Sequence, residues 1–265
     1  MRNIKQLFNF YISSSLHVGL AILVYAKIVS LHFHQNANFN WFYFVFFATT
    51  VGYNFLKYYE FFTTRNYYFG KFFYVIFAVS LIGILFSIYF FLKLNNSLKI
   101  NIFICSLLVF LYPFLRRFWY LKTICVAICV TVFIFSPYFN FSIFFKQQTN
   151  EIGINHFLYI LKIFLFLLAS MIPFEIYDAQ YDDKTLQTIP QKFGVKITKI
   201  IGYFLIIFFI ILCIFENKTL RIDFIIAILM VLAIFFSSKN RSKYFCSFWV
   251  ESIPIIWLFL LSIFC

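Results

Sequence analysis

The sequence predicts an all-α, polytopic membrane protein in which nine transmembrane helices form a bundle. Three observations predict this fold class: the composition is strongly apolar, nine apolar runs have the length of a membrane span, and basic residues are distributed unevenly between these runs. Of the 265 residues, 63% are hydrophobic and 12% are charged, whereas soluble domains carry about 25% charged residues. Because no water-soluble fold can hide so much apolar surface, we expect a protein embedded in a lipid bilayer.

The apolar runs follow one another along the whole chain, and each is close to the roughly 20 residues that a helix needs to cross the hydrocarbon core. In order, they cover residues 10–31, 41–59, 71–92, 99–115, 120–138, 155–177, 196–215, 221–237 and 246–264. Uninterrupted apolar runs favour helices over barrel strands, in which apolar and polar residues alternate. The fourth, fifth and eighth runs are short, so neighbouring helices must tilt or the bilayer must thin. The sequence therefore predicts one transmembrane domain over residues 1–265.

Basic residues mark one side of the predicted bundle. Fifteen precede the first span or lie in the even-numbered connections: Arg2, Lys5, Lys57, Arg65, Lys71, Arg116, Arg117, Lys122, Lys184, Lys192, Lys196, Lys199, Lys239, Arg241 and Lys243. The odd-numbered connections hold five: Lys93, Lys99, Lys146, Lys218 and Arg221. Because cytoplasmic loops carry an excess of Lys and Arg, we expect an integral protein of the cell (inner) membrane with a cytoplasmic N-terminus and a C-terminus on the opposite side. Lys27 and Lys162, inside spans, are expected to snorkel.

The formal net charge of +13 would suggest a nucleic-acid partner in a soluble protein. In this chain the basic residues lie between apolar runs, and no polar surface suited to reading bases is predicted. Anionic lipid headgroups and phosphorylated substrates are therefore the expected counter-ions, and we expect no nucleic-acid partner.

Four of the nine acidic residues lie together at the predicted cytoplasmic end of the sixth span: Glu175, Asp178, Asp182 and Asp183. Helical spacing places the first three on one face, where like charges repel unless a cation lies between them. Carboxylates grouped in this way, close to bound phosphate, hold Mg²⁺ in proteins. The alternative interpretation is a solvated helix end whose acids pair with Lys184 and Lys192. Spacing alone leaves both interpretations open.

The residues that follow Glu175 carry a more specific pattern. The chain reads EIYDAQYDDKTLQTIPQKFG, with Thr188-Ile189-Pro190 and then Gly194 before the next span. This run resembles the second aspartate-rich region of the UbiA-type intramembrane prenyltransferases, which is close to DxxDxxxD followed by T-L-P and Gly. The resemblance implies that Glu175, Asp178 and Asp182 bind a Mg²⁺–diphosphate complex.

Other features agree with this resemblance, which extends over essentially the full chain. The family has nine transmembrane helices, a cytoplasmic N-terminus, and polar connections after helices two and six that cap a central cavity. Tyr112, followed by Arg116, Arg117 and Lys122, resembles the tyrosine and basic pair that lead into the fifth helix of the family. The resemblance therefore implies a nine-helix bundle around a central cavity, with the site on the cytoplasmic side.

The first aspartate-rich region of the family, NDxxDxxxD, is not kept. Asn54 is present, but the three acidic positions hold Phe55, Tyr58 and Phe62, and Glu60 is out of phase with the pattern. In the family, two carboxylate clusters face each other across the cavity and share metal ions that neutralise the departing diphosphate. Here a second metal ion has no obvious ligands.

Lys57 lies one helical turn beyond Asn54 and is expected to point into much the same space. A lysine inside a membrane span usually faces the interior of the bundle. We hypothesise that its ammonium replaces one Mg²⁺ as the counter-charge to a phosphate. Snorkelling to the cytoplasmic headgroups is the alternative.

The resemblance implies an enzyme that transfers an isoprenoid chain from a prenyl diphosphate to an acceptor in the membrane, with Mg²⁺ as cofactor. The catalytic positions would be Asp178, Asp182 and Lys57, and the metal ligands Glu175, Asp178 and Asp182. The substrate-binding positions would be Asn54, Arg65, Tyr112, Arg116, Arg117 and Lys122. The alternative is a catalytically inactive protein of the same fold that binds lipid or a partner. A transporter or assembly factor, for which no motif is present, is a third hypothesis.

Overall fold

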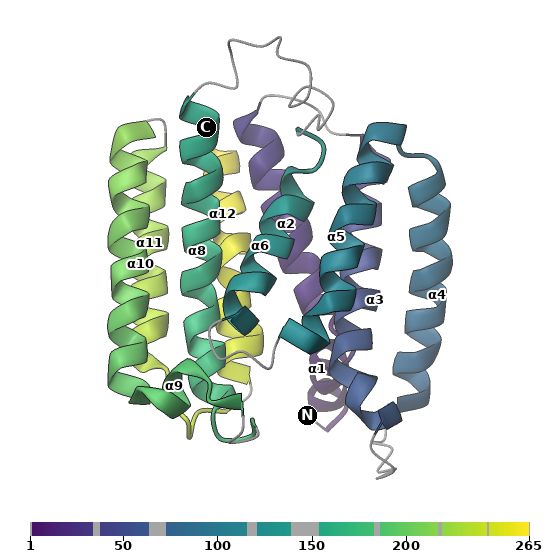
Figure 1. Ribbon diagram of the computed structural model, residues 1–265, viewed down its shortest axis with the longest axis horizontal. Coiled ribbons are helices and arrows are strands. Elements are labelled where there is room, and N and C mark those ends of the chain that lie inside the picture. The colour runs from purple at the N-terminus through teal and green to yellow at the C-terminus, as the bar shows by residue number, and fades with distance from the viewer. Residues whose placement is uncertain are drawn as a thin grey trace. The chain divides into compact units, whose positions relative to one another are not determined.

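The computed structural model describes residues 2–33, 38–63, 73–115, 121–138, 154–182, 186–216, 219–242 and 244–264, and all regular secondary structure in these ranges is helical (Figure 1). The predicted all-α fold is therefore confirmed for this part of the chain. The chain divides into two compact units, Met1–Lys99 and Ile100–Cys265.

Each of the nine predicted spans falls on a helix. In the first unit these are α1 (Arg2–Ser13) with α2 (Leu16–His32), α3 (Phe39–Thr63) and α4 (Phe73–Leu92). The boundary between the units falls within α5 (Asn96–Leu115). The second unit continues with α6 (Leu121–Phe135), α8 (Ile154–Asp178), α10 (Gly194–Glu216), α11 (Leu220–Phe236) and the π-helix η2 (Phe245–Val250), which runs into α12 (Glu251–Phe264). A short helix, α9 (Ile189–Lys192), precedes α10.

Several of these helices have the length and composition of membrane spans. Within the described ranges, the helical segments Phe73–Leu92, Asn155–Asp178, Gly194–Glu216 and Phe245–Phe264 are long and apolar enough to cross a bilayer, and α1 with α2 gives a fifth if this bent pair is one span. Two shorter apolar helices cover Asn96–Leu111 and Lys122–Phe135. Long helices with exposed apolar side chains indicate an integral membrane protein. The full set of nine spans stays a prediction.

The first predicted span contains a break that apolar composition did not reveal. Ser15 adopts a left-handed conformation with φ of 59°, and the axes of α1 and α2 differ by 60°. Ser14 donates a hydrogen bond to the carbonyl oxygen of Tyr11 at 3.2 Å, which is the local bonding by which serine competes with helical structure. Further along, Gly19 lies against Thr50 so closely that a Cβ atom at position 19 would clash, so α2 and α3 approach closely there.

In the second unit, α8 is the central helix. It packs against α6, α10, α11 and η2, and Figure 1 shows α8, α10, α11 and α12 running alongside one another. The aromatic rings of Phe166, Phe209 and Trp257, from α8, α10 and α12, contact one another with centroids 5.0 to 5.9 Å apart. This apolar core fixes the axis of α8, which contributes residues to two polar clusters.

Candidate functional site

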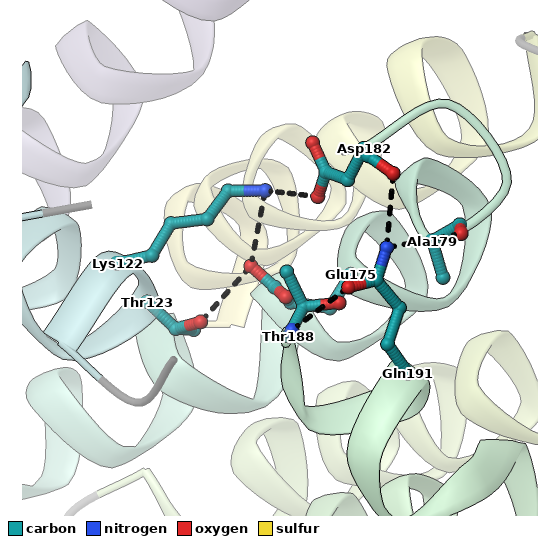
Figure 2. A network of polar contacts seen from close by, with 7 residues as sticks. All are labelled: Lys122, Thr123, Glu175, Ala179, Asp182, Thr188 and Gln191. Carbon is teal, nitrogen blue, oxygen red and sulfur yellow. Dashed lines mark hydrogen bonds and ion pairs between the residues drawn. The ribbon is translucent and has the colours of Figure 1, made fainter. Parts of the chain in front are cut away.

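A cluster of polar side chains lies at the C-terminal end of α8, where the chain turns toward α9 (Figure 2). The Lys122 ammonium, on the first turn of α6, is 2.8 Å from Asp182 Oδ2 and 3.6 Å from Glu175 Oε1. Thr123 donates a hydrogen bond to the same Glu175 oxygen at 3.0 Å. These four residues, Lys122, Thr123, Glu175 and Asp182, are called the Lys122 cluster. Lys122 comes from the basic segment before the fifth predicted span, and Glu175 and Asp182 come from the acidic segment at the end of the sixth.

The cluster is mostly buried, but two of its side chains are partly exposed. The Glu175 side chain is 6% exposed, whereas those of Lys122 and Asp182 are 14% and 15% exposed. A carboxylate withdrawn from water requires a charged or hydrogen-bonded partner. Lys122 and Thr123 supply both to Glu175, while the partial exposure of Lys122 and Asp182 leaves the cluster open to a ligand.

The turn that carries Asp182 is held by α9. Gln191 donates hydrogen bonds from Nε2 to the carbonyl oxygens of Asp182 at 3.0 Å and Ala179 at 3.5 Å. Its Oε1 accepts a hydrogen bond from the backbone N–H of Thr188 at 3.1 Å, as in a capping box. Pro190 suits the first turn of a helix because the N–H that it lacks would have no helical partner. The Thr188-Ile189-Pro190 segment therefore forms the start of α9, and Gln191 in this helix holds the turn that carries Asp182.

Gly194 also has a structural explanation. It joins α9 to α10 with φ of 81°, a left-handed conformation that glycine adopts without the penalty of a Cβ atom. This conformation lets the chain pass from the short α9 into the long apolar α10. The glycine of the motif therefore sets the position of α9 beside the acidic turn.

Of the three acidic residues predicted to share one helix face, two lie on the helix. Glu175 and Asp178 lie in the last turn of α8, but the helix ends at Asp178 and Asp182 lies in the following turn. Asp182 nevertheless reaches the same ammonium as Glu175. The Asp178 carboxylate forms no hydrogen bond or ion pair with the residues that the structure describes. Among these residues Glu175 Oε2 is likewise buried without a hydrogen-bond partner.

The fit of this cluster to Mg²⁺ is incomplete. Carboxylate oxygens are the ligands that Mg²⁺ prefers, and the unpartnered Glu175 Oε2 is available as one. In the described ranges, however, no three acidic, histidine or cysteine side chains converge closely enough to hold a metal ion. The cation between Glu175 and Asp182 is the ammonium of Lys122. The arrangement fits an ammonium ion, and Mg²⁺ stays a prediction.

For the other basic and aromatic residues that the sequence predicted for the site, the structure describes few contacts. Arg65, Arg116 and Arg117, together with Asp183 and Lys184, lie outside the described residues. Tyr112 belongs to α5, but its side chain is also outside the description. Lys192, expected to pair with the acids if the helix end were solvated, is exposed and lies over the ring of Phe193 at 5.5 Å. Their roles toward a substrate stay predictions.

In the first unit, Asn54 is a buried residue of α3. Its side chain is 3% exposed and donates a hydrogen bond to Ser80 Oγ on α4 at 3.0 Å. Asn54 Oδ1 is buried without a hydrogen-bond partner in the described part of the chain. The amide therefore links α3 to α4 and keeps one acceptor unused.

Lys57, also on α3, contacts the broken end of α1. Its ammonium donates to the carbonyl oxygens of Ile12 at 3.4 Å and Ser13 at 3.3 Å, and the Tyr58 hydroxyl donates to the Ser13 oxygen at 2.9 Å. The last carbonyls of a helix lack helical partners and attract cations. Lys57 and Tyr58 therefore cap α1, which gives a structural role to Tyr58, at a position that is acidic in the UbiA-type pattern. A contact between Lys57 and a phosphate stays a prediction.

A second polar cluster was not predicted from the sequence. Lys162 of α8 lies 2.6 Å from Glu216 Oε2 of α10 and 3.0 Å from Asp223 Oδ2 of α11, and Thr219 donates to the same Asp223 oxygen at 2.8 Å. We call these four residues the Lys162 cluster. Because Lys162 is 1% exposed and paired inside the protein, the prediction that it snorkels to the headgroups is wrong. The sequence contains a signal for this cluster: Glu216 and Asp223 lie on either side of a short connection, and Lys162 lies inside a predicted span.

Three comparisons with known proteins bear on this site. The chain matches no protein-family model, no curated protein and no solved structure. The similarity to UbiA-type prenyltransferases therefore rests on the residues of the two motif segments. Membership of that family is accordingly a proposal.

Proposed function

We propose that this chain is a UbiA-type intramembrane prenyltransferase, which moves an isoprenoid chain from a prenyl diphosphate to an acceptor dissolved in the membrane. One observation carries the proposal: the acidic segment around Glu175 and the basic segment that ends at Lys122 meet in the Lys122 cluster. These are the two segments whose residues resemble the family. They meet at the C-terminal end of α8, which is long and apolar enough to span a bilayer.

The protein groups have distinct roles in this proposal. Glu175, Asp178 and Asp182 form the acidic side of the diphosphate site, and Lys122 supplies a positive charge beside it. Gln191 and Thr188 hold the turn of Asp182, so the carboxylates are preorganised before substrate arrives. A bound Mg²⁺ would neutralise charge on the departing diphosphate.

The proposal also assigns roles that the described contacts do not include. The additional residues that contact or surround the diphosphate would be Asn54, Lys57, Arg65, Tyr112, Arg116 and Arg117. Phe-rich helices of a nine-span bundle would enclose the prenyl chain in a central cavity. The N-terminus and the site would face the cytoplasm, in agreement with the excess of basic residues on that side.

The second candidate is a catalytically inactive protein of the same fold that binds lipid or a partner. Two observations favour it: the Lys122 ammonium takes the position of a cation between Glu175 and Asp182, and Tyr58 caps α1 where the family has an acid. Such a protein would bind a prenyl diphosphate without releasing diphosphate.

The test is an assay of the purified protein in lipid nanodiscs with Mg²⁺, labelled prenyl diphosphates of several lengths and a host lipid extract. Diphosphate release and labelled lipid product are measured for the unmodified protein, for Asp178→Asn, and for the control Tyr181→Phe, an exposed residue of the same segment. The proposal expects release that Asp178→Asn lowers by roughly 100-fold or more and that Tyr181→Phe keeps. Saturable binding without release would support the inactive candidate. Neither binding nor release would contradict both.

A further inference from the structure

The helix α1 has two chemically different sides. Helical spacing assigns Gln6 and Asn9 to one side of α1, and Leu7 and Tyr11 to the other. The Leu7 side chain is 69% exposed, so the apolar side is at least partly uncovered. A helix with one polar side and one apolar side is suited to the boundary between water and lipid.

The charge of α1 is positive. Its sequence contains Arg2 and Lys5 and no acidic residue, and helical spacing assigns both basic residues to the polar side with Gln6. Helices that combine a basic polar side with an apolar side bind the surfaces of bilayers that contain anionic lipid. Charge complementarity therefore favours anionic headgroups as the partner of this helix.

The break between α1 and α2 gives α1 an orientation that suits such a surface. The helix α2 has 17 residues, which is within the range that can span a bilayer without any contribution from α1. The axes of the two helices differ by 60°. If α2 crosses the membrane near the bilayer normal, α1 lies closer to the membrane plane than to the normal.

Contacts from α3 hold the end of α1 at this break. The Lys57 ammonium donates hydrogen bonds to the carbonyl oxygens of Ile12 and Ser13. The Tyr58 hydroxyl donates to the Ser13 oxygen as well. Because these donors satisfy carbonyls at the end of α1, they stabilise a helix that stops at the break instead of continuing into α2. The bend is therefore a supported feature of the first unit.

We propose that α1 lies in the headgroup layer of the membrane and binds anionic lipids. Leu7 and Tyr11 enter the boundary of the acyl chains, and Arg2 and Lys5 contact the phosphate groups of the headgroups. The layer is the one on the side that the excess of basic residues marks as cytoplasmic. The first membrane span then begins with α2 instead of at residue 10. This interaction surface is independent of prenyl transfer.

The first test locates Leu7 relative to lipid in the full protein. A photoreactive benzophenone amino acid replaces Leu7 in one sample and Gln6 in another, since these adjacent residues are both exposed and belong to different sides of α1. After illumination in lipid nanodiscs, mass spectrometry should find several-fold more lipid adducts at position 7 than at position 6. Equal yields, or no lipid adduct at position 7, would overturn the proposal. Adducts between position 7 and a second protein chain would show a protein interface and would overturn it too.

The second test measures the dependence on lipid charge. Hydrogen exchange of residues 6–13 is compared in nanodiscs of phosphatidylcholine with and without phosphatidylglycerol. The anionic lipid should slow this exchange by roughly fivefold or more in the unmodified protein, and high salt should remove most of the difference because it screens surface charge. This comparison of lipids requires no variant.

A pair of double variants assigns the effect to α1. Arg2→Gln with Lys5→Gln should lose most of the slowing by phosphatidylglycerol. The matched control, Lys93→Gln with Lys99→Gln, removes the same charge from lysines outside α1 and should keep it. Exchange that is indifferent to phosphatidylglycerol in the unmodified protein would contradict the proposal, as would an equal loss in the two double variants.

Discussion

The Lys162 cluster and the Lys122 cluster both involve α8 and have a similar composition, but their residues come from different elements. Each pairs one lysine with two carboxylates from elsewhere in the second unit. Lys162 and Glu175 are separated by about 20 Å along the helix at 1.5 Å per residue. In the Lys162 cluster the lysine and Asp223 are 1% and 2% exposed, whereas Lys122 and Asp182 are 14% and 15% exposed.

This difference separates a structural cluster from one that is available to a ligand. Lys162 joins three long helices, α8, α10 and α11, so its ion pairs cross-link the helical core. In the Lys122 cluster, Asp182 is on a turn that α9 holds independently. Charge and residue type alone therefore do not distinguish the two clusters, whereas the elements that carry the acids and the exposure of their side chains do.

The largest effect is expected for Lys162→Met. Removing the ammonium leaves Asp223 as an unpaired buried carboxylate, and breaking a buried pair in this way costs about 3 to 5 kcal/mol. The free energy of unfolding, measured by denaturing-detergent titration, should fall by that amount, while Lys196→Met should leave it unchanged. A loss below about 1 kcal/mol, which is typical of surface ion pairs, would remove the distinction between the two clusters.

A smaller and local effect is expected for Gln191→Ala. This change removes the side chain that caps α9 and holds the turn of Asp182, and loss of a helix cap costs about 1 kcal/mol. Hydrogen exchange should accelerate in residues 179–182 and 188–192, with little change around Lys162. The control is Gln180→Ala, at an exposed glutamine of the same turn. Equal acceleration around Lys162 would show that the two clusters are not independent.

Much of the fold could be predicted from the sequence because membrane helices are encoded locally. An apolar run of about 20 residues has no stable alternative to a helix in lipid, and all nine predicted runs fall on helices. The break between α1 and α2 was missed because it depends on the backbone conformation of Ser15. Apolar composition carries no information about a single left-handed residue.

Only those parts of the site that consist of residues close together in the sequence could be predicted. The acids and the segment from Thr188 to Gly194 could be identified by their pattern, but the contact of Lys122 with Asp182 joins residues from different helices. The same limit explains the error at Lys162, whose partners lie on α10 and α11. Which lysine meets which carboxylate is set by tertiary packing.

The most direct test of the account compares both lysines in one unmodified sample. The protein is treated with an amine-reactive reagent, with and without Mg²⁺ plus inorganic diphosphate, and the labelling of Lys122 and Lys162 is quantified by mass spectrometry. If diphosphate binds beside Lys122, its negative charge pairs with the ammonium, and the labelling of Lys122 should fall by a few-fold, within the usual range for coupled sites. Lys162, buried in its own cluster, should stay unlabelled in both conditions. Identical labelling of Lys122 in the two conditions would contradict the claim that the Lys122 cluster binds diphosphate.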